Sequence, residues 1–182
     1  MDIDSESLAR FFHVLFGIVW IGHLYFFNLT NLPAFKMSIK GNDAGQKGGP
    51  HLMMRALWWF RWGAMGTLLF GLWLLDERIK TLGMDYSGFF ELPEGQNIGI
   101  GMALAIVMWF NVWFIIWPAQ KVVLGNNMAI AKGVAEDEKK RLEGQNAPLA
   151  ARAKMASRFN FWASIPMLFF MVFASHVPLE LW

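Results

Sequence analysis

The sequence predicts an all-α integral membrane protein, in which a single domain over residues 1–182 forms a bundle of four membrane-spanning helices. Three observations support this prediction. Of the 182 residues, 55% are hydrophobic and only 16% are charged. The apolar residues gather in four segments, each close to the about 20 residues that a helix needs to cross a bilayer. The charged residues gather between these segments, as expected for connections outside the membrane.

Breaks in hydropathy set the bounds of the four segments. We expect spans at about residues 8–32, 56–75, 98–117 and 159–177. Pro33, Pro118 and Pro178 follow the first, third and fourth spans, and a proline disfavours continuation of a helix. The second span ends at a charged run that begins with Asp76.

Two further helical features are expected in the third connection. Residues 129–143 predict a short helix, with the charged run at residues 136–141 as its solvated face. Pro148 suits the first turn of a long helix that continues into the fourth span.

Small residues recur every four positions in two spans: Gly63, Thr67 and Gly71 in the second, and Gly101 and Ala105 in the third. This spacing lets helix backbones approach closely. Many membrane proteins with several spans share it, so it supports a bundle without indicating a function.

The positions of lysine and arginine predict the orientation, because cytoplasmic connections are enriched in both. The first and third connections carry most of them: Lys36, Lys40, Lys47 and Arg55, then Lys121, Lys132, Lys139, Lys140, Arg141, Arg152, Lys154 and Arg158. The second connection has only Arg78 and Lys80 among five carboxylates. We therefore expect both termini on the extracytoplasmic side of a bacterial inner membrane that the chain crosses several times.

The composition excludes several classes of site. The chain has no cysteine, which excludes disulfides, iron–sulfur clusters, thiolate zinc sites and covalently attached haem. Its formal net charge of +2 is too small to suggest a nucleic-acid partner. The sequence has no phosphate-binding glycine loop, zinc-protease motif or nucleophile elbow. Because residues 1–7 are acidic, we interpret the first span as retained rather than as a cleaved signal peptide.

The strongest candidates for a functional site are His13 and His176, near the outer ends of the first and last expected spans. An even number of crossings places these two ends on one side of the membrane. Ionisable side chains within a span are costly and are most often functional. Two imidazoles at matched depth suit a haem iron, so we predict that they ligate a b-type haem. Two alternatives stay open: interfacial histidines that bond to backbone carbonyls, and a quinone or another metal.

Neighbouring residues fit a flat apolar cofactor. Gly17 lies one turn after His13 on nearly the same face and leaves room for a macrocycle. Phe169 and Phe173 share a face of the last span with His176 and supply apolar walls. We therefore include Gly17, Phe169 and Phe173 in the expected cofactor-binding site.

Four other residues are secondary candidates. His23 lies about 15 Å deeper than His13, at about 1.5 Å per residue, and we expect it to hydrogen-bond Asn111 of the third span; a second cofactor is the alternative. His51 is expected to be an interfacial histidine at the cytoplasmic start of the second span. Arg61 lies inside that span and is expected to extend to the headgroups, or alternatively to pair with an anionic group.

Several stretches resemble the membrane region of the bacterial membrane-bound urate oxidases, which end in a cytochrome c domain. The similar stretches are HVLFGIVWIG at residues 13–22, WFRW at 59–62, IWPAQKVV at 116–123 and IPMLFFMVFASHVP at 165–178. The resemblance implies a redox function and cofactor-binding histidines at positions 13 and 176. The chain departs from the family pattern at Arg158 and at residues 97–101, where histidines are expected, and it has no Cys-x-x-Cys-His motif.

The sequence leaves three functions open. The first is electron transfer by a membrane-embedded b-type haem, with a cytochrome c or a quinone as redox partner. The second is a cofactor-free accessory or scaffold subunit of a larger respiratory or photosynthetic membrane complex. The third is urate oxidation, with the cytochrome c as a separate polypeptide. Each places the chain among membrane lipids. For any of these functions, a larger membrane complex or a homo-oligomer is an expected form of assembly.

Overall fold

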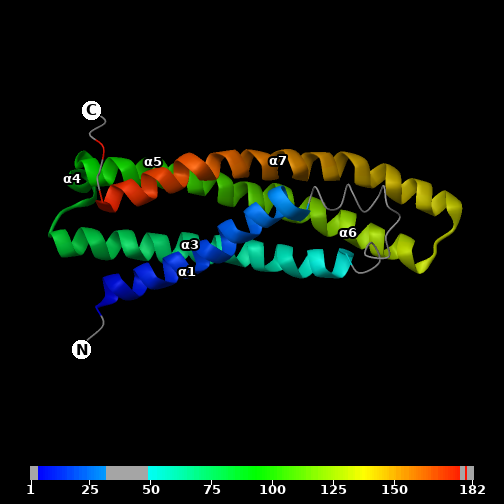
Figure 1. Cartoon of the computed structure of the whole chain (residues 1–182), viewed down its shortest axis with the longest axis horizontal. Helices are drawn as coiled ribbons and strands as arrows, with labels where there is room; N and C mark the ends of the chain where they lie inside the picture. Colours follow the sequence, from blue (N-terminus) through cyan, green and yellow to red (C-terminus); the bar gives the residue numbers. More distant parts are fainter. Residues whose placement is uncertain (1–3, 32–48, 177–178, 180–182) are drawn as a thin grey trace.

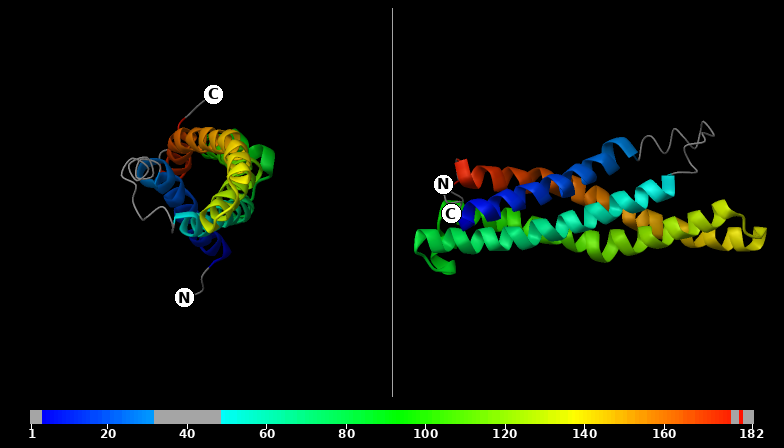
Figure 2. Two further views of the ribbon diagram at one scale, coloured as in Figure 1. Left: turned by 90° about the vertical axis from the view of Figure 1, so that its right-hand side faces the viewer. Right: turned by 90° about the horizontal axis from the view of Figure 1, so that it is seen from below.

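The computed structural model describes residues 4–31, 49–176 and 179, and every regular element within them is a helix. The prediction of an all-α fold is therefore confirmed for this part of the chain. The molecule is an elongated stack of helices that run side by side (Figure 1). The views from the end and from below agree with this arrangement (Figure 2).

The long helices run back and forth along the long axis of the molecule (Figure 1). α1 (Ser5–Tyr25) continues into the π-helical η1 (Phe26–Asn31), and α3 (Gly49–Leu82) comes next. The short α4 (Tyr86–Glu91) leads to α5 (Pro93–Phe110), which continues through the π-helical η3 (Asn111–Ile116) into α6 (Trp117–Lys132). α7 (Glu136–His176) returns along the molecule. α1 packs mainly on α3, whereas α7 packs on α5 and α6.

Three helical stretches of the described residues are long and apolar enough to cross a membrane: Ser5–Asn31, Pro93–Lys132 and Glu136–Ala174. They overlap the first, third and fourth expected spans. With 34 residues at about 1.5 Å each, α3 is also long enough, at about 51 Å. Its apolar part is interrupted by Arg61 and by several tryptophans, and α3 is not one of the three. The crossing by α3 stays a prediction.

The helix does not end at Pro118, contrary to the sequence expectation. The residues before Pro118 form η3, where the Trp117 N–H group donates to the carbonyl of Val112, five residues earlier. A proline has no N–H group, and in a regular α-helix its ring collides with the carbonyl four residues earlier. The wider π-helical turn relieves this conflict, so the helix continues to Lys132.

The third connection also differs from the expected short helix over residues 129–143. α6 ends at Lys132 because Gly133 has a φ of 91°, in the left-handed region that glycine adopts at little cost. α7 begins at Glu136, so Pro148 lies inside α7 rather than in its first turn. The expectation of one long helix leading into the fourth span is confirmed.

Close contact between α1 and α3 depends on glycines of α3. A Cβ on Gly63 would lie 3.0 Å from a backbone nitrogen of α1, and one on Gly66 would clash with the ring of Phe16. A Cβ on Gly71 would lie 2.8 Å from the His13 Nδ1. The small residues expected in the second span therefore do permit a close helix approach, and they set the position of His13.

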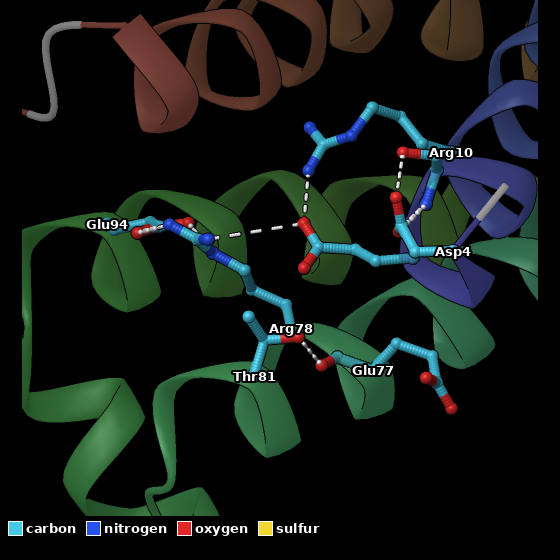
Figure 3. Close-up of polar contacts among 8 residues, drawn as sticks. Asp4, Arg10, Glu77, Arg78, Thr81 and Glu94 are labelled. Carbon is cyan, nitrogen blue, oxygen red and sulfur yellow. Dashed lines mark hydrogen bonds and ion pairs between the residues drawn. The ribbon is translucent and has the colours of Figure 1, made fainter. Parts of the chain in front are cut away.

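An ionic cluster joins three helices at the end of the molecule that holds both termini (Figure 3). Arg78 of α3 donates to both carboxylate oxygens of Glu94 on α5, over 2.9 and 3.0 Å. The same guanidinium lies 4.0 Å from Glu6 of α1, which also pairs with Arg10 at 2.6 Å. The cluster therefore ties α1, α3 and α5 together.

Two carboxylates near this cluster have lowered pKa values. Hydrogen bonds from Ser5 and then Lys80 lower the pKa of Glu77 below its ordinary 4.5. Hydrogen bonds from Lys80 and then Tyr86 lower the pKa of Asp76 below its ordinary 3.8. Their stabilising effect is complete above the pKa of the unfolded chain, and it is lost as the pH falls through the lower pKa of the folded chain.

We predict that Gly66→Ala lowers the stability of the α1–α3 contact. The added Cβ clashes with Phe16, and overpacking costs about 1–3 kcal/mol. The matched control is Gly22→Ala on α1, where a Cβ meets nothing within 4 Å in the described residues; alanine there favours the helix by up to about 1 kcal/mol. The free energy of unfolding of each variant is measured in mixed micelles. An equal change in this free energy for the two substitutions would contradict the close contact.

We also predict that the ionised Glu77 side chain stabilises the protein and that this stabilisation is lost in acid. The midpoint of thermal unfolding should be insensitive to this group above about pH 4.5, the pKa of an ordinary glutamate, and should fall as the pH decreases below that. In Glu77→Gln the midpoint at neutral pH should be lower, and the decrease in acid should be smaller. Glu143→Gln, which removes an exposed carboxylate of α7, is the control. An identical pH profile for wild type and Glu77→Gln would rule out the assigned role.

Candidate functional site

His13 lies between α1 and α3 with one ring nitrogen held by the backbone. Its Nδ1 is 2.9 Å from the carbonyl oxygen of Thr67 on α3. A carbonyl only accepts hydrogen bonds, so Nδ1 must carry the proton. In the neutral ring the lone pair is then on Nε2. The ring is half-buried, and Gly71 beside it leaves the space that it occupies.

His176 has the same arrangement in the last turn of α7. Its Nδ1 is 3.0 Å from the carbonyl oxygen of Val172, one turn earlier. Nδ1 therefore carries the proton here too, and in the neutral ring the lone pair is on Nε2. Unlike His13, this side chain is exposed, and its hydrogen-bond partner is on its own helix.

Both histidines lie toward the same end of the molecule. The start of α1 and the end of α7 are found at the end where the N- and C-termini lie (Figure 1). The hydrogen bonds of the two rings do not join them, because His13 is tied to α3 and His176 to α7. In the described residues no three or more side chains of histidine, cysteine, aspartate or glutamate form a cluster for a metal ion. A site here would rest on two imidazoles.

The residues expected to surround a cofactor take different positions. At Gly17 a Cβ would meet nothing within 4 Å among the described residues, so this face of α1 is open. The rings of Phe169 and Phe173 stack on each other with centroids 4.2 Å apart. Met171 of α7 packs against Gly101 of α5, and residues two apart on a helix differ by about 200° in direction. The stacked pair therefore lies on the side of α7 away from α5.

His23 does not bond to Asn111, and this expectation is wrong. The Nδ1 of His23 is 2.7 Å from the carbonyl oxygen of Val19 on its own helix. Asn111 instead donates from Nδ2 to the Oδ1 of Asn160 on α7, over 2.8 Å. A histidine in a helix finds the carbonyl one turn earlier without any tertiary partner, so the local bond is formed.

Asn160 is the centre of a buried polar network that the sequence interpretation did not identify. Its side chain is fully buried and donates to the carbonyl oxygen of Met108 over 2.9 Å, in addition to the bond it accepts from Asn111. Asn28 of η1 donates to the hydroxyl of Ser157 on α7 over 3.0 Å. These residues could have been found in the sequence as uncharged polar residues within apolar segments, because such residues hydrogen-bond between helices.

Each π-helical segment carries an asparagine that hydrogen-bonds to α7. Asn28 lies within η1, and Asn111 is the first residue of η3. Short π-helical segments are rare and are frequent at functional sites. Here the two segments contribute separate contacts to α7, Asn28 with Ser157 and Asn111 with Asn160.

Arg61 is held by aromatic rings rather than by a carboxylate. Its guanidinium carbon lies 4.1 Å from the ring centroid of Trp117, 4.8 Å from that of Trp113 and 5.4 Å from that of Trp62. These three rings come from α6, η3 and α3. His51, by contrast, is exposed near the start of α3, as an interfacial histidine would be.

No family model matches the chain, and no curated protein or solved structure matches it. The resemblance to the membrane region of urate oxidases therefore stays a prediction from the sequence.

We predict that Asn160→Leu destabilises the packing of α5, η3 and α7. The substitution leaves the Asn111 side-chain amide without its acceptor and removes one of the donors to the Met108 carbonyl, at a cost of about 1–3 kcal/mol. The double variant Asn111→Leu, Asn160→Leu should lose less than the sum of the two single variants, because the two side chains share one bond. The free energies of unfolding of the wild type, the two single variants and the double variant are measured in mixed micelles. If the two single losses add up to the loss in the double variant, the two asparagines act independently.

Proposed function

We propose that this protein is a membrane-embedded electron-transfer protein that binds a b-type haem through His13 and His176. The proposal rests on the tautomer of the two imidazole rings, in which each Nδ1–H group donates to a backbone carbonyl. Each Nε2 then has the lone pair that would bind the iron. Histidine ligands of metals ordinarily donate their other ring N–H in this way, which fixes the tautomer and the ring orientation.

The proposed placement is four crossings, with both termini on the extracytoplasmic side. Three stretches have the length and hydropathy for this, and α3 has the length. Lys132 and Arg141 lie near the α6–α7 turn, at the end of the molecule far from the termini in Figure 1. An excess of cations at that end favours its placement in the cytoplasm.

The residues present fit a haem by their chemistry. The neutral imidazoles of His13 and His176 would hold the iron of a haem, and the group would supply one-electron redox chemistry there. The Thr67 and Val172 carbonyls orient the two rings. Gly17 leaves one face of α1 open, and the stacked Phe169 and Phe173 present an apolar surface on α7.

An accessory subunit without a cofactor is the second candidate. The observation that favours it is the exposed apolar side of α7, where Met155, Phe159 and Trp162 are 71%, 50% and 65% exposed. Large exposed aromatic side chains suit contact with another membrane protein as well as with lipid. The local carbonyl bond of His176 needs no cofactor to hold the ring.

The test is a reduced-minus-oxidised absorption spectrum of the protein purified from cells supplied with haem. We expect b-type bands in the wild type and their loss in His13→Ala and in His176→Ala, because each substitution removes one of the two proposed iron ligands. His51→Ala removes an exposed histidine of α3 outside the proposed site and should keep the bands.

Folding is checked by helical content and by a monodisperse elution profile. A correctly folded wild-type protein without b-type bands would reject the haem proposal. Co-purification of that protein with a larger membrane complex would then favour the accessory subunit.

A further inference from the structure

Arg61 is a cation without a carboxylate partner within an apolar part of α3. In the part of the chain that the structure describes, no acidic oxygen lies within 4.0 Å of it, and its buried Nε has no hydrogen-bond acceptor. Three indole rings attract the charge. An indole offers no lone pair, however, to the five N–H donors of a guanidinium. The hydrogen-bonding capacity of Arg61 therefore remains available.

The position of Arg61 along α3 separates it from the histidine pair. Gly71, which contacts His13, lies ten residues further along α3, or about 15 Å at 1.5 Å per residue. Arg61 is thus displaced toward the end where α3 begins, which the proposed orientation places at the cytoplasmic side. A group bound at His13 would not account for it.

Exposed tryptophans indicate the depth of Arg61. Trp58, Trp59 and Trp62 are 44%, 50% and 41% exposed on the same turns of α3. Tryptophans gather where the headgroups meet the hydrocarbon. At that depth the abundant anion is the phosphodiester of a lipid. The exposed Lys121 lies one turn after Trp117 on α6. It adds a second cation near the aromatic cage, by which we mean the indole rings of Trp62, Trp113 and Trp117 around Arg61.

We propose that Arg61 and the three indoles of Trp62, Trp113 and Trp117 form a binding site for a phosphate group, occupied by an anionic lipid headgroup of the cytoplasmic leaflet. The indoles hold the guanidinium plane, and its N–H groups donate to the phosphate oxygens. A planar guanidinium matches two phosphate oxygens at once, which an ammonium group does not. The site rests on the proposed crossing by α3 and is independent of haem binding.

The experiment compares lipid retention by the full chain after transfer from nanodiscs of phosphatidylglycerol and phosphatidylcholine into a neutral detergent. Native mass spectrometry should show preferential retention of phosphatidylglycerol by the wild type. Arg61→Gln should lose this preference, and Arg61→Lys should weaken it by about tenfold, the value of one charge-assisted hydrogen bond. Arg55→Gln removes an exposed arginine of the same helix and should retain the preference.

A second arm separates a lipid from a free anion. Inorganic phosphate is titrated onto the delipidated protein, and tryptophan emission reports on the cage. A saturable change that Arg61→Gln abolishes would support the phosphate site with a free anion as its ligand. Selective lipid retention without such a change would support the headgroup.

The proposal is overturned if the folded Arg61→Lys and Arg61→Gln variants retain phosphatidylglycerol as the wild type does and phosphate changes no emission. The aromatic cage would then be a structural contact alone. The absorption spectrum of bound haem is not expected to differ in these variants, so failure here is distinguishable from failure of the haem proposal.

Discussion

Every backbone N–H and C=O group of a helix that crosses a bilayer must find its partner within the protein, because the hydrocarbon offers none. The long segments of the described chain are helical, and the α-helical hydrogen-bond pattern is altered in η1 and η3 and interrupted at Pro148 and Pro166 inside α7. In η3 the hydrogen-bond register widens, and the carbonyl of Met108 receives the amide of Asn160 from α7. A side chain of one helix thus completes the backbone bonding of another, which makes the packing of α5 and α7 specific.

The histidines also satisfy their hydrogen-bonding groups within the protein. Each of His13, His23 and His176 satisfies its Nδ1 with a backbone carbonyl, but only His13 uses a carbonyl of a different helix. That bond requires α1 to lie close to α3, and the glycines of α3 make the approach possible. The orientation of the His13 ring is therefore a consequence of helix packing. The ring of His176 depends only on the local geometry of α7.

Length and apolar content were sufficient to predict the long helices but not the short α4, and the spacing of Gly63 and Gly71 was sufficient to predict a close helix contact. Helix ends were harder. Pro118 could not be recognised as internal, because hydropathy and proline position do not reveal the π-helical turn that comes before it. The break at Gly133 depends on a positive φ that many glycines do not adopt. Side-chain partners between distant helices, such as Asn111 with Asn160, need the fold itself.

The arginines of α1 and α3 have different partners at different positions along the length of the molecule. The ionic cluster of Glu6, Arg10, Arg78 and Glu94 is at the end with both termini, and its charges neutralise one another. Arg61 lies toward the other end, where the described residues supply aromatic rings but no carboxylate within ion-pair distance. A charge that is compensated inside the protein stabilises the fold. One that is only attracted to aromatic rings keeps its hydrogen-bond donors for a ligand, and this difference separates the structural arginines from Arg61.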